Sequence, residues 1–127
     1  MEEKKINLEV KGEQVSVEAD EQLLRQALFN LLLNAIQAVN GSGEIQIVAQ
    51  KRNATEALLE VRDNGPGVPP DRRAEIFKPY FTTQKTGTGL GLAVVQQIVL
   101  AHGWEIECLA NAPKGAIFRI THLKVAA

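Results

Sequence analysis

The chain has 127 residues, 45% of them hydrophobic and 23% charged, which is enough for one domain with a buried core and too few for two. Its formal net charge of -1 provides no broad attraction to nucleic acid or to an anionic membrane, so we expect neither nucleic-acid binding nor direct membrane contact. The single cysteine, Cys108, excludes an internal disulfide. No apolar run is long enough to span a bilayer, and the charged start is not a signal peptide. We expect one cytoplasmic domain over residues 1–127, within a parent polypeptide that can itself be anchored in a membrane.

The first third of the chain predicts two strands and a long helix. Apolar residues alternate over 6–10 and again over 15–19, and the polar link Lys11-Gly12-Glu13 predicts that the two strands form a hairpin. Asp20 is a suitable N-cap and Gly41 a suitable C-terminal stop, so residues 20–40 are predicted to form one helix.

The rest of the chain predicts further strands and helical segments on both sides of a polar loop. In chain order these are strands at 44–50 and 57–62 joined around Asn53, a helical turn at 71–76, a mobile loop at 78–89, a buried helix at 90–101, and a final hairpin of strands at 104–110 and 116–121. The expected fold is α+β: a mixed sheet with helices packed on one face, in a two-layer α/β sandwich.

Two asparagines interrupt the leucine-rich part of the predicted helix. Asn30 and Asn34 flank Leu31-Leu32-Leu33, although asparagine costs roughly 0.5 kcal/mol relative to alanine inside a helix. Helical periodicity places Asn30, Asn34 and Gln37 on the stripe opposite the leucines. The amides are either exposed or bonded to loop carbonyls, or the amide oxygen of Asn34 is a ligand for Mg2+, which binds few protein groups. Position alone leaves both readings open.

A carboxylate stands at the start of a glycine turn. Asp63 ends a predicted strand and is followed by Asn64-Gly65-Pro66-Gly67-Val68. Glycine allows positive φ and lets a ligand approach the backbone, so a carboxylate held here can accept a hydrogen bond from an exocyclic amine such as that of adenine. An ordinary Asn-Gly turn, in which Asp63 accepts from a local amide, is the alternative.

A second glycine-rich segment precedes the apolar helix. Its glycines are spaced differently from those of a dinucleotide-binding fingerprint, and no P-loop lysine follows. Backbone N–H groups and the positive end of the helix can face an anion there, with side-chain donors close by in the chain; a flexible linker is the alternative. The segment is Gly87, Thr88, Gly89, Leu90, Gly91 and Leu92, and the nearby donors are Thr82, Thr83, Lys85 and Thr86.

Taken together, these segments resemble the catalytic, ATP-binding domain of bacterial sensor histidine kinases, in the GHKL superfamily with its Bergerat-type ATP-binding fold. The stretch from Asn30 to Ala35 resembles the family's N box, with Asn34 in the magnesium-binding place. Asp63 to Gly67 is similar to the first glycine box, whose aspartate binds the adenine amine, and Gly87 to Leu92 to the second, at the end of the ATP lid. Phe77 and Phe81 stand in the phenylalanine box.

The resemblance implies a set of ATP-binding residues and a reaction. The implied residues are Asn30, Asn34, Asp63, Gly65, Gly67, Val68, Thr82, Thr83, Lys85, Gly87, Thr88, Gly89, Leu90, Gly91 and Leu92, with Asn34 as the Mg2+ ligand. The implied partners are ATP or ADP, a separate dimerisation and phosphoacceptor domain of the same parent, and the receiver domain of a response regulator. The chain would be the catalytic half of a protein-histidine kinase, inactive without its acceptor domain.

Two positions depart from relatives, of which the first bears on the reaction and the second on how adenine or its water is held. ATP-hydrolysing relatives have a glutamate four residues before the magnesium asparagine, whereas this chain has Asn30, and an amide cannot act as a general base. In the family a threonine often follows the glycine of the last glycine segment; here that glycine is Gly115 and Ala116 follows it. His102 and His122 do not resemble the family's acceptor histidine. A GHKL ATPase or serine kinase, or a nucleotide-binding module without turnover, remains the alternative.

Overall fold

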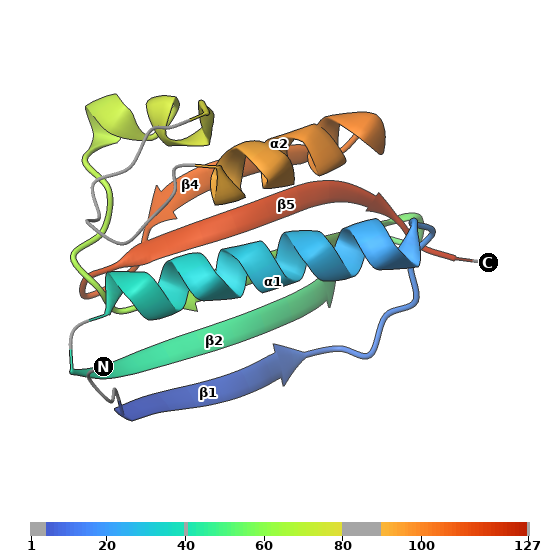
Figure 1. The fold of residues 1–127 in the computed structure, drawn as a ribbon. Coiled ribbons are helices and arrows are strands. Elements are labelled where there is room, and N and C mark those ends of the chain that lie inside the picture. Colours follow the sequence, from blue (N-terminus) through green and yellow to red (C-terminus); the bar gives the residue numbers. More distant parts are fainter. Residues whose placement is uncertain (1–4, 40, 80–89, 127) are drawn as a thin grey trace.

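A computed structural model describes residues 5–39, 41–79 and 90–126. Within these ranges a five-stranded mixed sheet, in the order β1-β2-β3-β5-β4, carries two α-helices on one face (Figure 1). The elements in chain order are β1 (Lys5–Gly12), α1 (Glu21–Ala38), β2 (Ser42–Lys51), β3 (Glu56–Asp63), the 3-10 turns η1 (Pro70–Arg72) and η2 (Glu75–Phe77), α2 (Gly91–Ala101), β4 (Glu105–Ala110) and β5 (Ala116–Lys124). The predicted α+β class and the one-sided layer of helices are confirmed.

The predicted N-terminal hairpin is wrong. Strand β1 pairs in parallel with β2, from Lys5 opposite Ser42 to Gly12 opposite Ala49, so that α1 is the crossover between them. The segment after β1 instead approaches the end of the chain, where Val17 forms an isolated antiparallel bridge with Val125. Alternation of apolar residues correctly identified extended chain, but it contains no information about the partner strand.

Gly12 explains why the link after β1 looked like a hairpin turn. Its φ is +103°, and a Cβ added there would lie 2.0 Å from the carbonyl oxygen of Ala49 in β2. The glycine is therefore needed because two backbones approach each other closely at the end of a parallel ladder, and not because the chain reverses there.

Helix α1 begins and ends close to the predicted residues. The Asp20 carboxylate accepts a hydrogen bond from the Leu23 N–H at 3.1 Å, which caps the first turn. The fully buried stripe consists of Ala27, Leu31 and Ala35. The leucine pattern predicted a buried stripe on the side of α1 opposite the asparagines, but the observed stripe lies closer to them. Asn30 and Asn34 are therefore half-buried beside the core and are not on the opposite face.

Helix α2 and the central strands complete the core. The buried face of α2, formed by Val95, Ile98 and Val99, belongs to one apolar cluster with Phe118 and Ile120 of β5 and with the buried stripe of α1. Cys108 on β4 is also buried in this cluster, and burial raises the pKa of its thiol to about 11. The two later hairpins, β2–β3 and β4–β5, form antiparallel ladders as predicted.

His102 joins the ends of the two helices. Its Nε2 accepts from the backbone N–H of Asp20 at 3.1 Å, which leaves Nδ1 to donate to the carbonyl of Ile98 at 2.8 Å. The ring also stacks on Trp104, with centroids 4.1 Å apart. His102 is thus held through both ring nitrogens at the ends of α1 and α2. In the described ranges, no helix combines the length and apolarity needed to cross a membrane.

Candidate functional site

The Asp63 carboxylate is almost fully buried at the end of β3, with 2% of the residue exposed. Both backbone donors that reach it bind the same oxygen: Oδ1 accepts from the Gly65 N–H at 2.9 Å and from the Ala116 N–H at 3.3 Å. Among the described residues, none donates a hydrogen bond to Oδ2. The described residues therefore orient the carboxylate through one oxygen and leave the other without a donor from among them.

Burial raises the pKa of the Asp63 carboxyl above its usual range. The two backbone hydrogen bonds act in the opposite direction because they favour the charged form, but they do not compensate for the loss of water. Neither donor is a cation, so the carboxylate has no ion-pair partner in these contacts. A buried acceptor with this environment is suited to a neutral hydrogen-bond donor.

The turn that follows Asp63 packs against two other segments without room for side chains. A Cβ on Gly65 would lie 2.7 Å from the carbonyl oxygen of Ala38, the last residue of α1. A Cβ on Gly115, whose φ is +111°, would lie 1.9 Å from the carbonyl oxygen of Asp63. Glycine at these places brings the end of α1, the Asp63 turn and the start of β5 into direct backbone contact.

Asn30 of α1 contacts the start of α2. The Asn30 side-chain amide donates to the carbonyl of Gly91 at 3.3 Å. Asn34, one turn further along α1 toward Gly65, is half-buried, and the described parts of the chain offer its side chain no hydrogen-bond partner. The helix that carries the N-box asparagines therefore contacts both the Asp63 turn and the first residue of α2.

Several predicted site residues lie outside the described ranges, and the mobile loop expected at 78–89 does so from residue 80 onward. The residues concerned are Thr82, Thr83, Lys85, Gly87, Thr88 and Gly89. Of the others, Leu90 is the N-cap residue of α2, and the first turn of that helix is not capped by a side-chain hydrogen bond. Leu92 and Val68 are half-buried against the core, and the Val68 carbonyl accepts from Arg73 Nε at 3.0 Å.

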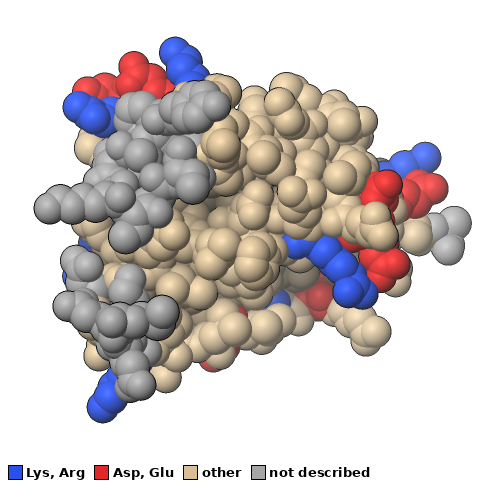
Figure 2. All heavy atoms as spheres, in the orientation of Figure 1, with Lys and Arg blue, Asp and Glu red and all other residues tan. Residues whose placement is uncertain are grey.

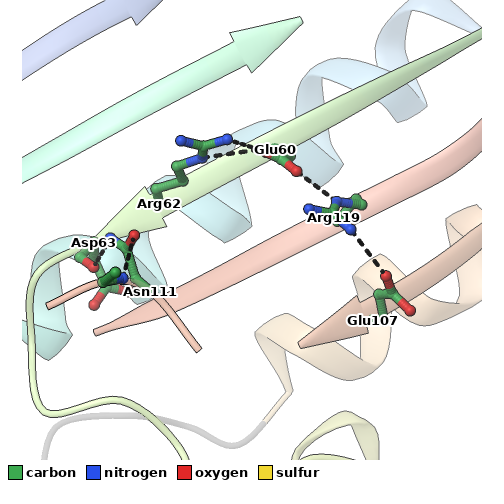
Figure 3. A network of polar contacts seen from close by, with 7 residues as sticks. Glu60, Arg62, Asp63, Glu107, Asn111 and Arg119 are labelled. Carbon is green, nitrogen blue, oxygen red and sulfur yellow. Dashed lines mark hydrogen bonds and ion pairs between the residues drawn. The ribbon is translucent and has the colours of Figure 1, made fainter. Parts of the chain in front are cut away.

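Sequence reasoning did not predict the contacts of two asparagines that hold the Asp63 turn: Asn111, which it did not name, and Asn64, which it named only as part of the motif. The Asn111 amide donates to the Asp63 main-chain carbonyl at 2.8 Å (Figure 3). The Asn64 side chain accepts from the backbone N–H of Glu44 in β2 at 2.9 Å. The sequence shows that Asn111 stands beside the predicted turn at Pro113-Lys114-Gly115. Its hydrogen-bond partner, however, lies 48 residues away, and no local pattern identifies that partner.

An ion-pair network on the other face of the sheet fixes the strands that carry the site. Side chains alternate along β3, so Glu60 points away from the helices, and it is buried between Arg62 and Arg119 of β5 (Figure 3). Burial alone would raise the pKa of Glu60, but hydrogen bonds and charges from Arg119 and Arg62 outweigh it and hold that pKa below its usual range. Arg119 also contacts Glu107 at 3.4 Å, which links β3, β5 and β4.

The described part of the helix-bearing face has few charged side chains. Figure 2 shows this face with few charged side chains, which gather toward its margins. In the described ranges, no three histidine, cysteine or acidic side chains come together as a metal site would require. Binding of an anion with a metal would thus depend on neutral oxygens such as that of Asn34, on backbone donors and on the ligand's own charge.

A family comparison identifies the class of protein. A sequence profile described as "Histidine kinase-, DNA gyrase B-, and HSP90-like ATPase" matches residues 19–127. This match covers most of the chain, including the asparagines of α1 and the Asp63 turn. The chain belongs to this family.

Individual relatives are sensor kinases. The sensor histidine kinase ZraS of Salmonella typhimurium strain LT2 is 45% identical over 104 residues, which are 82% of this chain and 22% of that protein. The signal transduction histidine-protein kinase AtoS of Escherichia coli K12 is 38% identical over 112 residues, 88% of this chain and 18% of that protein. The chain spans about a fifth of the length of these curated relatives.

Solved structures agree with the fold. A mycobacterial sensor histidine kinase, MprB, has a TM-score of 0.86 at 32% identity, with 94% of this chain and 82% of that chain covered. The histidine kinase ThkA in complex with the response regulator TrrA has a TM-score of 0.79 at 30% identity, with 94% and 34% covered. This chain is a histidine-kinase-type ATPase domain, as its motifs predicted.

Proposed function

We propose that residues 1–127 are the catalytic half of a larger sensor kinase, that they bind Mg-ATP, and that they donate the γ-phosphoryl group to a histidine on a separate dimerisation domain. Relay to the receiver domain of a response regulator would follow. The observation that carries this proposal is the Asp63 carboxylate, buried beside the end of α1, with two backbone donors on Oδ1 and, from the described part of the chain, none on Oδ2. The family match and the sensor-kinase relatives support the same reading.

In this proposal Asp63 recognises the adenine amine. An ionised carboxylate accepts hydrogen bonds and donates none, so it favours an exocyclic amine over a carbonyl at the same place on the base. Gly65, Gly67 and Val68 would lie along the base, because the glycine turn keeps side chains away from the acceptor.

The phosphates would lie between α1 and the start of α2. Asn34 would hold Mg2+ through its amide oxygen, and Asn30 fixes Gly91 at the beginning of α2. Bound there, Mg2+ would neutralise charge on the phosphates. We assign the remaining phosphate contacts to the polar segment that precedes α2 and to the first turn of α2. The residues are Thr82, Thr83, Lys85, Gly87, Thr88, Gly89, Leu90 and Leu92.

The contacts of Asn30 favour phosphoryl transfer over hydrolysis. Its amide is a donor to the Gly91 carbonyl, and an amide cannot take a proton from water at neutral pH. His102 is held between the helix ends, and His122 contacts Thr121 at 3.0 Å and Glu105 at 3.6 Å. The phosphoryl acceptor is therefore proposed to come from outside this chain, as in-line transfer requires a nucleophile beside the γ-phosphate.

A labelling experiment tests the proposal. The chain is incubated with γ-labelled ATP and Mg2+, with and without the dimerisation domain of its parent. We expect label on a histidine of the added domain, recognised because it is stable to base and labile to acid, and no useful rate of phosphate release from the chain alone. Rapid phosphate release without the added domain would favour the ATPase alternative, and label on a serine would favour the serine-kinase alternative. Binding without any turnover would indicate a nucleotide-binding module.

Asn34→Ala is expected to weaken ATP binding through the metal. The variant removes a neutral oxygen ligand from a half-buried position that has no other described partner, so Mg-dependent ATP affinity should fall at least about fivefold. Calorimetry with and without Mg2+ measures the effect, and metal-free adenosine binding should change little. Equal losses under both conditions would show a general defect and remove Asn34 from the metal site.

A further inference from the structure

The Asp63 main chain lies where one ladder of the sheet stops. Strand β3 pairs with β5 as far as Arg62 opposite Ile117, and the next residue of β5, Ala116, directs its N–H to the Asp63 side chain. The Asp63 carbonyl therefore receives no donor from the β5 ladder. The Asn111 amide supplies that donor at 2.8 Å from across the β4–β5 turn (Figure 3).

Asn111 is also held by hydrogen bonds within its own turn. Its Oδ1 accepts from the Ala112 N–H at 3.0 Å, and its backbone N–H donates to the Gly115 carbonyl at 3.0 Å. The side chain thus cannot rotate without losing contacts within its own turn. It acts as a rigid link between the β4–β5 turn and the end of β3.

We infer that Asn111 is a positioning residue for base recognition: by giving the Asp63 carbonyl its donor, it leaves the Ala116 N–H free to orient the Asp63 carboxylate. Without this donor, the buried carbonyl would be unsatisfied and would compete with Oδ1 for the Ala116 N–H. The carboxylate would then lose one of the two bonds that fix it, and the direction of Oδ2 with it. The ligand class affected is purine nucleotides that carry an amine at the six-position, and the inference rests on the proposed adenine role of Asp63.

The test measures preference for the amine and not affinity alone. Calorimetry compares ADP with purine riboside 5′-diphosphate, which lacks the amine, on the wild-type chain and on Asn111→Ala. We expect the preference for ADP to fall about fivefold, while affinity for the analogue stays nearly unchanged, because one hydrogen bond's orientation is lost. A purely structural role would weaken both ligands to the same extent.

Asn53→Ala is the matched control. Asn53 organises the β2–β3 turn in a similar way, since its Oδ1 accepts from the backbone N–H groups of Thr55 and Glu56 at 2.9 Å, yet it does not contact the Asp63 turn. It should lower the stability of the chain without changing the preference for ADP. Asn111→Asp, which keeps the acceptor for Ala112 and removes the donor, replaces Asn111→Ala if that variant does not fold, and the same loss of preference is expected.

The outcomes separate this inference from the proposed function. If the wild-type chain shows no preference for ADP over the analogue, the adenine role of Asp63 fails, and the inference fails with it. If Asp63→Asn removes the preference and the Asn111 variants keep it, the proposed function stands and Asn111 is only a turn residue. A further loss of preference when Asn111→Ala is added to Asp63→Asn would also contradict a role exerted through Asp63.

Discussion

Asp63→Asn is expected to weaken ATP and ADP binding at least about tenfold, or ~1.4 kcal/mol, without unfolding the chain. The amide oxygen can still accept from the Gly65 and Ala116 N–H groups, so the turn keeps its two orienting bonds. The amide nitrogen, however, replaces Oδ2 and presents donors to the base amine, where an acceptor is needed. Calorimetry of ADP binding measures the effect, and unchanged affinity would remove Asp63 from the adenine site.

The same variant should be more stable than the wild-type chain at neutral pH. Burial raises the pKa of Asp63 in the folded chain above its value in the unfolded chain, so the folded chain binds this proton more tightly. The resulting stabilisation is present in acid and is lost as pH rises through the folded-state pKa. Asparagine avoids this loss because it carries no charge. The difference in free energy of unfolding between Asp63→Asn and wild type should therefore shrink toward acid pH, whereas ADP affinity of the wild-type chain should fall there. A constant difference in urea titrations across pH would contradict the assignment.

Gly115→Ala is expected to lower the free energy of unfolding by more than about 3 kcal/mol and to abolish nucleotide binding. The added Cβ would lie 1.9 Å from the Asp63 carbonyl oxygen and 2.8 Å from the Asn64 Cα, and both are backbone atoms that cannot rotate away. The φ of +111° adds backbone strain for any residue with a Cβ. Urea denaturation of the variant measures the loss.

Gly103→Ala isolates the part of this effect that comes from the backbone conformation. Gly103 has a φ of +75°, but nothing lies within 4 Å of a Cβ added there. It should cost only about 1 kcal/mol, from the backbone conformation alone, and should leave nucleotide binding intact. If both variants lose the same stability, the close packing of Gly115 against Asp63 has no energetic weight.

The sequence predicted those parts of the fold that depend on local signals. Asp20 as an N-cap, the apolar run of α2 and the Asn53 turn each act within a few residues, and each was placed correctly. The partner of β1 depends on a crossover, and alternation cannot distinguish a parallel partner on β2 from an antiparallel neighbour. The stripe of α1 was misplaced because small residues such as Ala27 contribute little to a hydrophobic pattern, although they allow the closest packing.

The candidate site shows the same division. Asp63, Asn30 and Gly91 could be named as candidates because they stand in motifs that are continuous in the chain; the structure places Asn30 against Gly91, and their ligand roles stay predictions. The contact of Asn111 could not be predicted because it is made with one main-chain atom of a residue distant in sequence. The backbone role of Ala116 was missed because an N–H donor leaves no trace in the identity of its side chain.

The order in which the strands pair also determines when the Asp63 acceptor can be oriented during folding. The β2–β3 and β4–β5 pairs are hairpins of neighbouring strands and can form from local contacts, whereas the β3–β5 pairing joins residues far apart in the chain. Asp63 belongs to the first hairpin, and both Asn111 and Ala116 belong to the second. Without the second hairpin the carboxylate keeps only its local bond from the Gly65 N–H, so both orienting bonds are present only when the slow, non-local step is complete. A partly folded chain would carry the Asp63 motif and yet present an acceptor that is only partly oriented.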